Sequence, residues 1–146
     1  MNRDDFPAPQ EGVVLAHSFT VRNYEKARGF YRDVLGGRLI FESPPFGIIG
    51  VANTWVTLNE EAGPADDRPE VTLAPPTDVY RVSGYLCFRV ADIQATYEQW
   101  KSKGAEFLTP PIDHGMEIRC YMRDPDGYLI EVGQATGLLD LLKGQA

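Results

Sequence analysis

A short pattern occurs twice in this 146-residue sequence and constrains the fold more than any other feature. Val21-Arg22-Asn23 and Val90-Ala91-Asp92 lie 69 residues apart, and each joins the end of an apolar, strand-like run to Asn or Asp. Asn and Asp are favoured at helix N-caps because their side chains accept a hydrogen bond from a free backbone N–H. Apolar residues at helical spacing follow each pattern, and Gly and Pro then interrupt the chain at similar places. The repeat predicts two units of the order strand, helix and three strands.

The boundaries of these elements follow from periodicity and from turn residues. Residues 1–11 are expected to be an irregular lead-in, and the Pro-rich, acidic residues 61–83 a linker with a short extended piece at 70–73. In the first unit, about 12–60, strands are predicted at 12–21, 38–41, 47–52 and 54–59, with a helix at 24–35. In the second unit, about 84–134, strands are predicted at 85–90, 106–108, 117–122 and 128–132, with a helix from 93 to about 103 and a short docking helix at about 137–143.

The expected fold class is α+β, in a single domain built from two βαβββ modules. Each module would leave one apolar sheet face in need of cover. Pairing the two curved mixed sheets forms a cleft between them, which is a natural site for a small molecule. The sequence leaves open whether the modules pair within one chain or are exchanged between two chains.

Composition narrows the possible partners. The chain carries a net charge of −7, and neither half is basic, which argues against binding to nucleic acid. No apolar run is long enough to span a membrane and no signal-peptide core is present, so we expect a cytoplasmic protein without a membrane partner. Cys87 and Cys120 lie in apolar, strand-like runs without CxxC spacing, and both are predicted to be reduced and buried.

The stretch Asp124-Pro125-Asp126-Gly127 predicts a tight turn that leads into a strand. Alternation along that strand places Glu131 on the face opposite to Ile130 and Val132. One face of this strand therefore packs into a core, and the other presents a carboxylate.

Three segments together resemble the vicinal oxygen chelate superfamily, which contains glyoxalase I, bleomycin-resistance proteins and extradiol dioxygenases. They are Phe30-Tyr31-Arg32-Asp33-Val34-Leu35-Gly36-Gly37, Phe88-Arg89-Val90-Ala91-Asp92-Ile93 and Asp124 to Val132, and the resemblance covers roughly residues 13–134. It implies the paired-module fold and a homodimer, as is common in the family. It does not specify the reaction, because one fold hosts many functions.

Family members with metal-dependent chemistry place His, Gln or Glu ligands on the first and last strands of each module. Carried over one at a time, these positions fall on Ala16, Thr57, Tyr85 and Glu131. Only Glu131 is a ligand of the expected type. The resemblance therefore implies a degenerate metal site, and no cofactor is favoured.

Two histidines were weighed as replacement ligands. His17 lies next to Ala16, but a shift of one residue moves a side chain to the other face of a sheet, so a packed structural histidine is favoured. His114 lies in a Pro-Gly loop and is expected to be exposed to solvent. The alternative is a divalent metal (Zn, Ni, Fe or Mn) held by His17 and Glu131.

The favoured hypothesis is a cleft without metal. Its predicted residues are Glu131 as a catalytic or central group, with Tyr85, Arg89, Trp55, Thr57, Arg119 and Tyr121 as substrate-binding residues. A buried carboxylate needs a partner, and Arg89 is the first candidate counter-ion because it shares the predicted face of Tyr85. Arg119 is the second candidate.

Three functions remain open at this point. The first is a protein that binds or sequesters a small metabolite or antibiotic-like compound. The second is a metal-dependent enzyme of the glyoxalase or dioxygenase type that uses Glu131 and His17. The third is a metal-free isomerase or lyase with Glu131 as general base.

Overall fold

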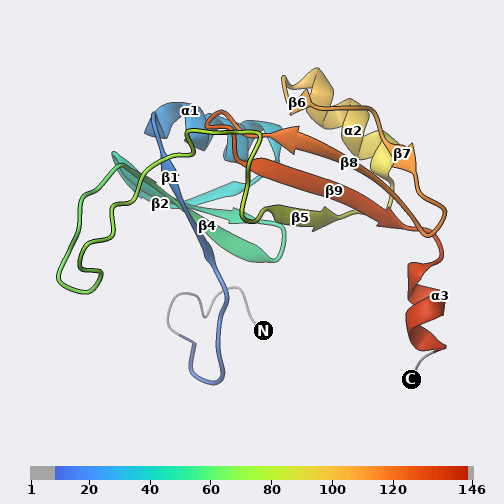
Figure 1. Ribbon diagram of the computed structural model, residues 1–146, viewed down its shortest axis with the longest axis horizontal. Coiled ribbons are helices and arrows are strands. Elements are labelled where there is room, and N and C mark those ends of the chain that lie inside the picture. Colours follow the sequence, from blue (N-terminus) through green and yellow to red (C-terminus); the bar gives the residue numbers. More distant parts are fainter. Residues whose placement is uncertain (1–8, 145–146) are drawn as a thin grey trace. The chain divides into compact units, whose positions relative to one another are not determined.

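The computed structural model describes residues 9–144, which divide into two compact units between Pro75 and Pro76 (Figure 1). Each unit contains one mixed sheet and one main helical segment. The expected α+β class and the two βαβββ modules are confirmed. Within residues 9–144, no helix is long and apolar enough to cross a membrane.

The first unit is a four-stranded sheet with a helical segment between its first and second strands. Strand β1 pairs in parallel with β4, and β4, β3 and β2 follow as antiparallel neighbours. The elements are β1 (His17–Val21), α1 (Tyr24–Gly29), the π-helical segment η2 (Phe30–Val34), β2 (Arg38–Ser43), β3 (Phe46–Val51) and β4 (Thr54–Glu60).

The core of the first unit lies between α1–η2 and one face of this sheet. Alternation selects Phe19 and Val21 from β1 and Val56 and Leu58 from β4, all of which are buried. The Phe19 ring stacks on Tyr31, with ring centroids 5.6 Å apart. The other face of the sheet carries Ser18, Trp55 and Thr57, as their register places them.

Two boundaries in this unit differ from the sequence prediction. The strand predicted from residue 12 begins only at His17, and Val13 and Leu15, at 90% and 82% exposed, pack into no core. The single helix predicted over 24–35 becomes π-helical from Phe30, where the Leu35 N–H donates to the Phe30 carbonyl.

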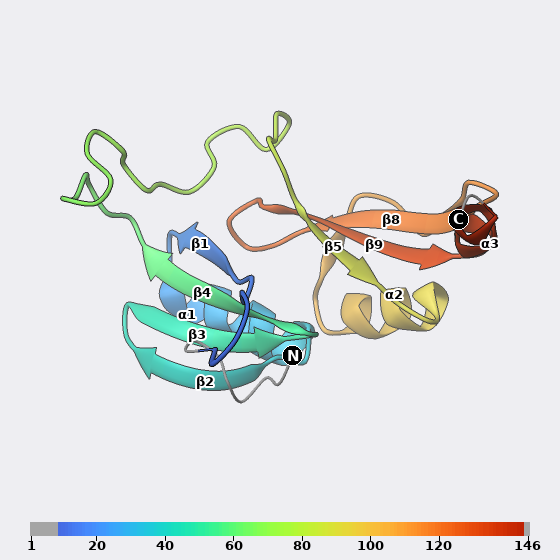
Figure 2. The same cartoon turned by 90° about the horizontal axis from the view of Figure 1, so that it is seen from below.

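The second unit repeats the order of elements, with one additional short strand. Strand β5 pairs in parallel with β9, β9 pairs with β8, and β8 pairs with both β6 and β7. The elements are β5 (Leu86–Arg89), α2 (Ile93–Ser102), β6 (Glu106–Phe107), β7 (Ile112–Asp113), β8 (Glu117–Arg123), β9 (Leu129–Ala135) and α3 (Leu138–Lys143). Figure 2 shows α2 along one face of the β5–β9–β8 sheet.

The helix α2 covers only one face of this sheet. Phe88 packs edge-on against Trp100, with ring centroids 5.6 Å apart. Cys120, Ile130 and Val132 share that covered face and are buried. The residues between them in the sequence therefore point to the opposite face.

The predicted turn before β9 is held by the Asp124 side chain. Its Oδ1 accepts hydrogen bonds from the backbone N–H groups of Asp126 and Tyr128, each 2.9 Å long. The turn therefore fixes where β9 begins, and with it the parity that sends Ile130 inward and Glu131 to the other face.

The segment between β4 and β5, residues 61–85, contains no long strand or helix. Two isolated bridges occur in it, Ala62 with Leu73 and Ala65 with Arg68. The Arg68 guanidinium donates to the carbonyls of Gly63 and Val71, at 2.6 and 2.8 Å. Of the extended piece predicted at 70–73, only Leu73 forms a bridge, and Glu70 lies in a turn with a φ of 66°.

Candidate functional site

The face of the second sheet opposite α2, here called the polar face, gathers most of the predicted site residues. Register places Glu131 on β9 directly between Cys87 on β5 and Tyr121 on β8. Candidate site residues on this face are Tyr85, Cys87, Arg89, Glu117, Arg119, Tyr121 and Glu131. The site thus follows from three alternating strands.

Glu131 is the most buried charged group on the polar face, with 7% of the residue exposed. The Tyr121 hydroxyl donates to Glu131 Oε2 at 2.9 Å, and Arg89 Nη1 lies 3.5 Å from Glu131 Oε1. The pKa of Tyr121 is raised above its ordinary value by burial and then by its hydrogen bond to Glu131. Tyr121 therefore remains a neutral phenol that donates to the carboxylate.

Arg89 connects Glu131 to a second carboxylate. Its Nη2 donates to Glu117 Oε2 at 3.1 Å, and Arg119 Nη1 donates to Glu117 Oε1 at 2.6 Å. These two guanidinium groups, Arg119 first, lower the pKa of the Glu117 carboxyl below its ordinary value. The result is a chain of alternating charges from Glu131 through Arg89 and Glu117 to Arg119.

The path of Arg89 depends on Gly133, its register partner on β9. A Cβ at position 133 would overlap the Arg89 guanidinium. The absence of a side chain at Gly133 therefore lets Arg89 lie over β9 and reach both carboxylates.

An aromatic pair stands beside these charges. The rings of Tyr85 and Tyr121 are nearly perpendicular, with centroids 5.8 Å apart. Tyr85 is 49% exposed, so its ring forms the open edge of the polar face. Arg89 and Tyr121 contact Glu131, the Tyr85 ring packs on Tyr121, and Arg119 joins them through Glu117. Their role in binding a substrate stays a prediction.

Cys87 corrects one prediction. It was expected to be buried, but it is exposed, because its parity is that of Tyr85 and Arg89 and not that of the residues facing α2. Partial desolvation of the Cys87 thiol among its neighbours, and next the nearby Glu131 charge, raise its pKa. Alternation along residues 85–89 was the signal that would have placed it on the polar face. Cys120 is buried as predicted, and burial raises its pKa to about 11.

The remaining predicted site residues belong to the first unit. Thr57 Oγ1 donates to Ser18 Oγ at 2.6 Å, and Trp55, on the same face, is 7% exposed. His17 has the parity of Phe19 and not of Thr57. The ring centroids of His17 and Phe19 lie 4.2 Å apart. The prediction of a packed histidine is not met, because His17 is exposed at the start of β1, although partial desolvation still lowers its pKa. His114, between β7 and β8, is exposed.

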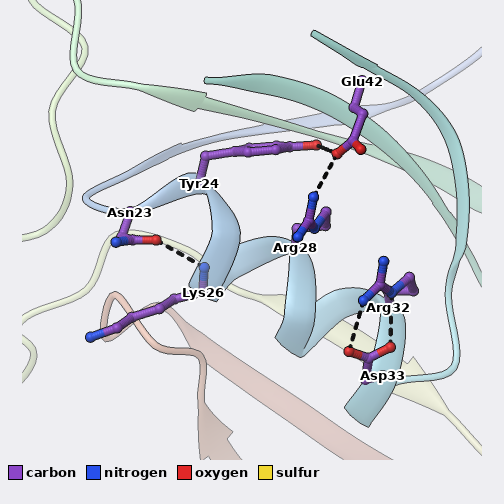
Figure 3. A network of polar contacts seen from close by, with 7 residues as sticks. All are labelled: Asn23, Tyr24, Lys26, Arg28, Arg32, Asp33 and Glu42. Carbon is purple, nitrogen blue, oxygen red and sulfur yellow. Dashed lines mark hydrogen bonds and ion pairs between the residues drawn. The ribbon is translucent and has the colours of Figure 1, made fainter. Parts of the chain in front are cut away.

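A second polar cluster, in the first unit, was not predicted (Figure 3). The Tyr24 hydroxyl and Arg28 Nη1 both donate to Glu42 Oε2, at 2.8 and 2.9 Å. Burial and the bond to Glu42 raise the pKa of Tyr24 to about 12. A Cβ at Gly47 would overlap the Tyr24 hydroxyl, so this glycine makes room for the ring. The cluster links α1 to β2, and we interpret its role as stabilising the fold.

The residues present do not fit the metal that the fold family implies. Of the four carried-over positions, Ala16 has no donor atom on its side chain and Tyr85 offers only a phenol. Thr57 is engaged with Ser18, and Glu131 already accepts from Tyr121 and pairs with Arg89. Within residues 9–144, His, Cys, Asp and Glu side chains form no group of three or more suited to hold a metal ion. Zinc and similar ions usually need three protein ligands.

Comparison with known proteins agrees with the fold. The family model for the glyoxalase/bleomycin resistance protein/dioxygenase superfamily matches residues 14–132. The chain is 29% identical to lactoylglutathione lyase from Pseudomonas aeruginosa over 87% of this chain and 85% of that protein.

Solved structures of low sequence identity share the same fold. The fosfomycin resistance protein FosX from Listeria monocytogenes, complexed with Mn(II) and sulfate, has a TM-score of 0.68 at 18% identity, covering 94% of this chain and 100% of that chain. TnmS3, an antibiotic binding protein from Streptomyces sp. CB03234, has a TM-score of 0.62 at 21% identity, covering 87% and 98%. The matched family model and the two βαβββ modules together show that this chain belongs to the glyoxalase/bleomycin resistance protein/dioxygenase superfamily.

Proposed function

We propose that this protein binds a small molecule on the polar face of its second sheet without the help of a metal ion. In this role it sequesters a metabolite or an antibiotic-like compound. One observation carries the proposal: both oxygens of Glu131 already face internal donors, Tyr121 on one side and Arg89 on the other. A metal ion at Glu131 would have to share the carboxylate with the Tyr121 hydroxyl and would be repelled by the Arg89 guanidinium beside it.

Two further features support a binding role. The exposed Tyr85 ring and the partly exposed guanidinium groups of Arg89 and Arg119 offer aromatic and hydrogen-bonding contacts side by side. A few polar groups placed among aromatic side chains are typical of small-molecule sites. The similar fold of TnmS3, an antibiotic binding protein, shows that this architecture can serve binding.

Metal analysis tests the proposal directly. The purified protein is dialysed, loaded with Mn²⁺ or Zn²⁺, dialysed again and subjected to elemental analysis. We expect no stoichiometric metal in the wild-type protein. Stoichiometric metal that disappears in Glu131→Gln, but not in the exposed control variant Glu25→Gln, would contradict the proposal.

A second candidate is favoured by the similarity to lactoylglutathione lyase. In that case the protein is a metal-dependent enzyme of the glyoxalase type, with Glu131 and His17 as ligands. His17 points with Phe19 to the helix-covered side of its sheet, which disfavours it as a ligand. Metal-dependent turnover of a hemithioacetal, abolished in both His17→Ala and Glu131→Gln, would establish this candidate in place of the first.

A further inference from the structure

We infer that the ligand of the polar face is an aromatic carboxylate or a close oxyanion analogue of one. This inference rests on the proposed function and specifies the ligand's chemistry. It starts from the depth of the charged groups. The Arg89 and Arg119 side chains are 43% and 36% exposed, whereas those of Glu131 and Glu117 are 10% and 18% exposed. A ligand approaching this face therefore meets guanidinium groups before carboxylates.

The hydrogen bonds on this face also favour an anionic ligand. Each carboxylate oxygen of Glu131 and Glu117 already faces a donor or a cation: Tyr121 and Arg89 for the first, Arg89 and Arg119 for the second. A guanidinium carries five N–H donors. Within residues 9–144, Arg119 bonds to Glu117 through Nη1, and Arg89 uses its two terminal nitrogens for Glu117 and Glu131. Every carboxylate oxygen on this face therefore already has a donor or a cation beside it, while both guanidinium groups keep N–H donors for a ligand.

A planar anion complements such a surface better than a cation does. Carboxylates form paired, charge-assisted hydrogen bonds with guanidinium groups. A cationic ligand would meet the two more exposed guanidinium groups first and would be repelled by them before it reached Glu131. The Tyr85–Tyr121 pair lies beside the charges and offers a surface on which an aromatic ring can pack. A ring bearing a carboxylate satisfies both parts of the face.

Three probes of nearly equal size and shape test the inference: benzoate, benzamide and benzylamine. Each is titrated into the full chain in the millimolar range expected for such fragments, and backbone amide shifts are followed by NMR. We expect benzoate to shift the amides of Tyr85, Tyr121 and Gly133 and to bind more tightly than benzamide, with benzylamine weakest. Arg119→Gln should weaken benzoate at least about tenfold, the scale of one lost charge-assisted contact.

Two variants act as controls of opposite kind. Arg32→Gln removes a comparably exposed, paired arginine from the first unit and should leave benzoate affinity unchanged. Glu117→Gln removes the carboxylate that competes for Arg89 and Arg119, so it should tighten benzoate binding. Because the second effect is a gain, it cannot arise from misfolding.

The possible results distinguish a wrong ligand class from a wrong binding site. If benzylamine or benzamide binds the polar face more tightly than benzoate, or if Arg119→Gln keeps full benzoate affinity, the carboxylate inference is wrong while the small-molecule site stands. If none of the three probes shifts the amides of Tyr85, Tyr121 and Gly133, both the inference and the proposed site are overturned.

Discussion

Two glycines, Gly133 and Gly47, leave the space that two long polar side chains occupy. Gly133 leaves space for the Arg89 guanidinium, and Gly47 leaves space for the Tyr24 hydroxyl that reaches Glu42. In each case a residue without a side chain lets a long polar side chain cross a strand and contact a carboxylate. Neither glycine lies in a turn. The reason for a glycine at each position can therefore be inferred only once the side chain that packs over it is known.

Gly133→Ala should therefore act through Arg89. The added methyl group forces the guanidinium away from Glu131 and should reduce the free energy of unfolding by about 1–3 kcal/mol, the usual cost of overpacking. Urea unfolding of Gly133→Ala, Arg89→Ala and the double variant measures this. In the Arg89→Ala background the alanine should cost less, because its clash is gone. Fully additive effects would show that Gly133 has no role in placing Arg89.

The Tyr121 hydroxyl should matter more than that of its neighbour Tyr85. Tyr121→Phe removes the donor to the buried Glu131 carboxylate, and a hydrogen bond to a charged group contributes about 1.5–3 kcal/mol. Tyr85→Phe, at a half-exposed position, should change the free energy of unfolding by less than about 0.5 kcal/mol. Equal effects of the two substitutions in urea unfolding would contradict this ranking.

At the scale of elements, helix caps and strand alternation are the reason why most helices and strands could be predicted from the sequence. Asn23 Oδ1 accepts from the Lys26 N–H and Asp92 Oδ1 from the Ala95 N–H, each at 3.0 Å, as the repeated pattern indicated. The ends of strands were less predictable. The predicted strand over residues 12–21 begins at His17, because tertiary burial and not propensity decides whether Val13 and Leu15 belong to it.

The cap of α2 can be tested in isolation. Asp92→Ala leaves the Ala95 N–H without its side-chain acceptor and should lower the free energy of unfolding by about 1 kcal/mol. Asp92→Asn keeps the acceptor oxygen and should stay close to wild type. The midpoint of urea unfolding gives both values. If the asparagine variant is as unstable as the alanine variant, the contribution of Asp92 is its charge and not the cap.

At the scale of the whole molecule, each unit holds a carboxylate between arginine or tyrosine donors. The pKa of Glu42 is lowered by its hydrogen bonds to Arg28 and Tyr24, and that of Glu117 by its bonds to Arg119 and Arg89. Both groups bind their proton at lower pH in the folded protein than in the unfolded chain. Their contribution to stability is therefore complete above about pH 4.5, the ordinary value of a glutamate.

Acid should consequently destabilise both units. As the pH falls from about 4.5 through the folded pKa values, the unfolded state holds more protons and the free energy of unfolding decreases. Glu42→Gln and Glu117→Gln should each flatten this decrease, whereas Glu25→Gln, which leaves both clusters intact, should not. Urea unfolding from pH 3 to 7 measures the slopes. Slopes identical to wild type in both cluster variants would refute the assignment.

The sequence by itself determined the repeat, the order of elements, the parity of each strand and the family. These properties depend on caps, turns and alternation, which act between residues close in the chain. It also indicated Arg89 as the partner of Glu131, since parity places both on one face. Only the tertiary structure decided that Glu117 links Arg89 to Arg119 and that Tyr24 reaches Glu42. These contacts depend on the register between strands and on the space left by Gly133 and Gly47, and a single strand's pattern contains neither.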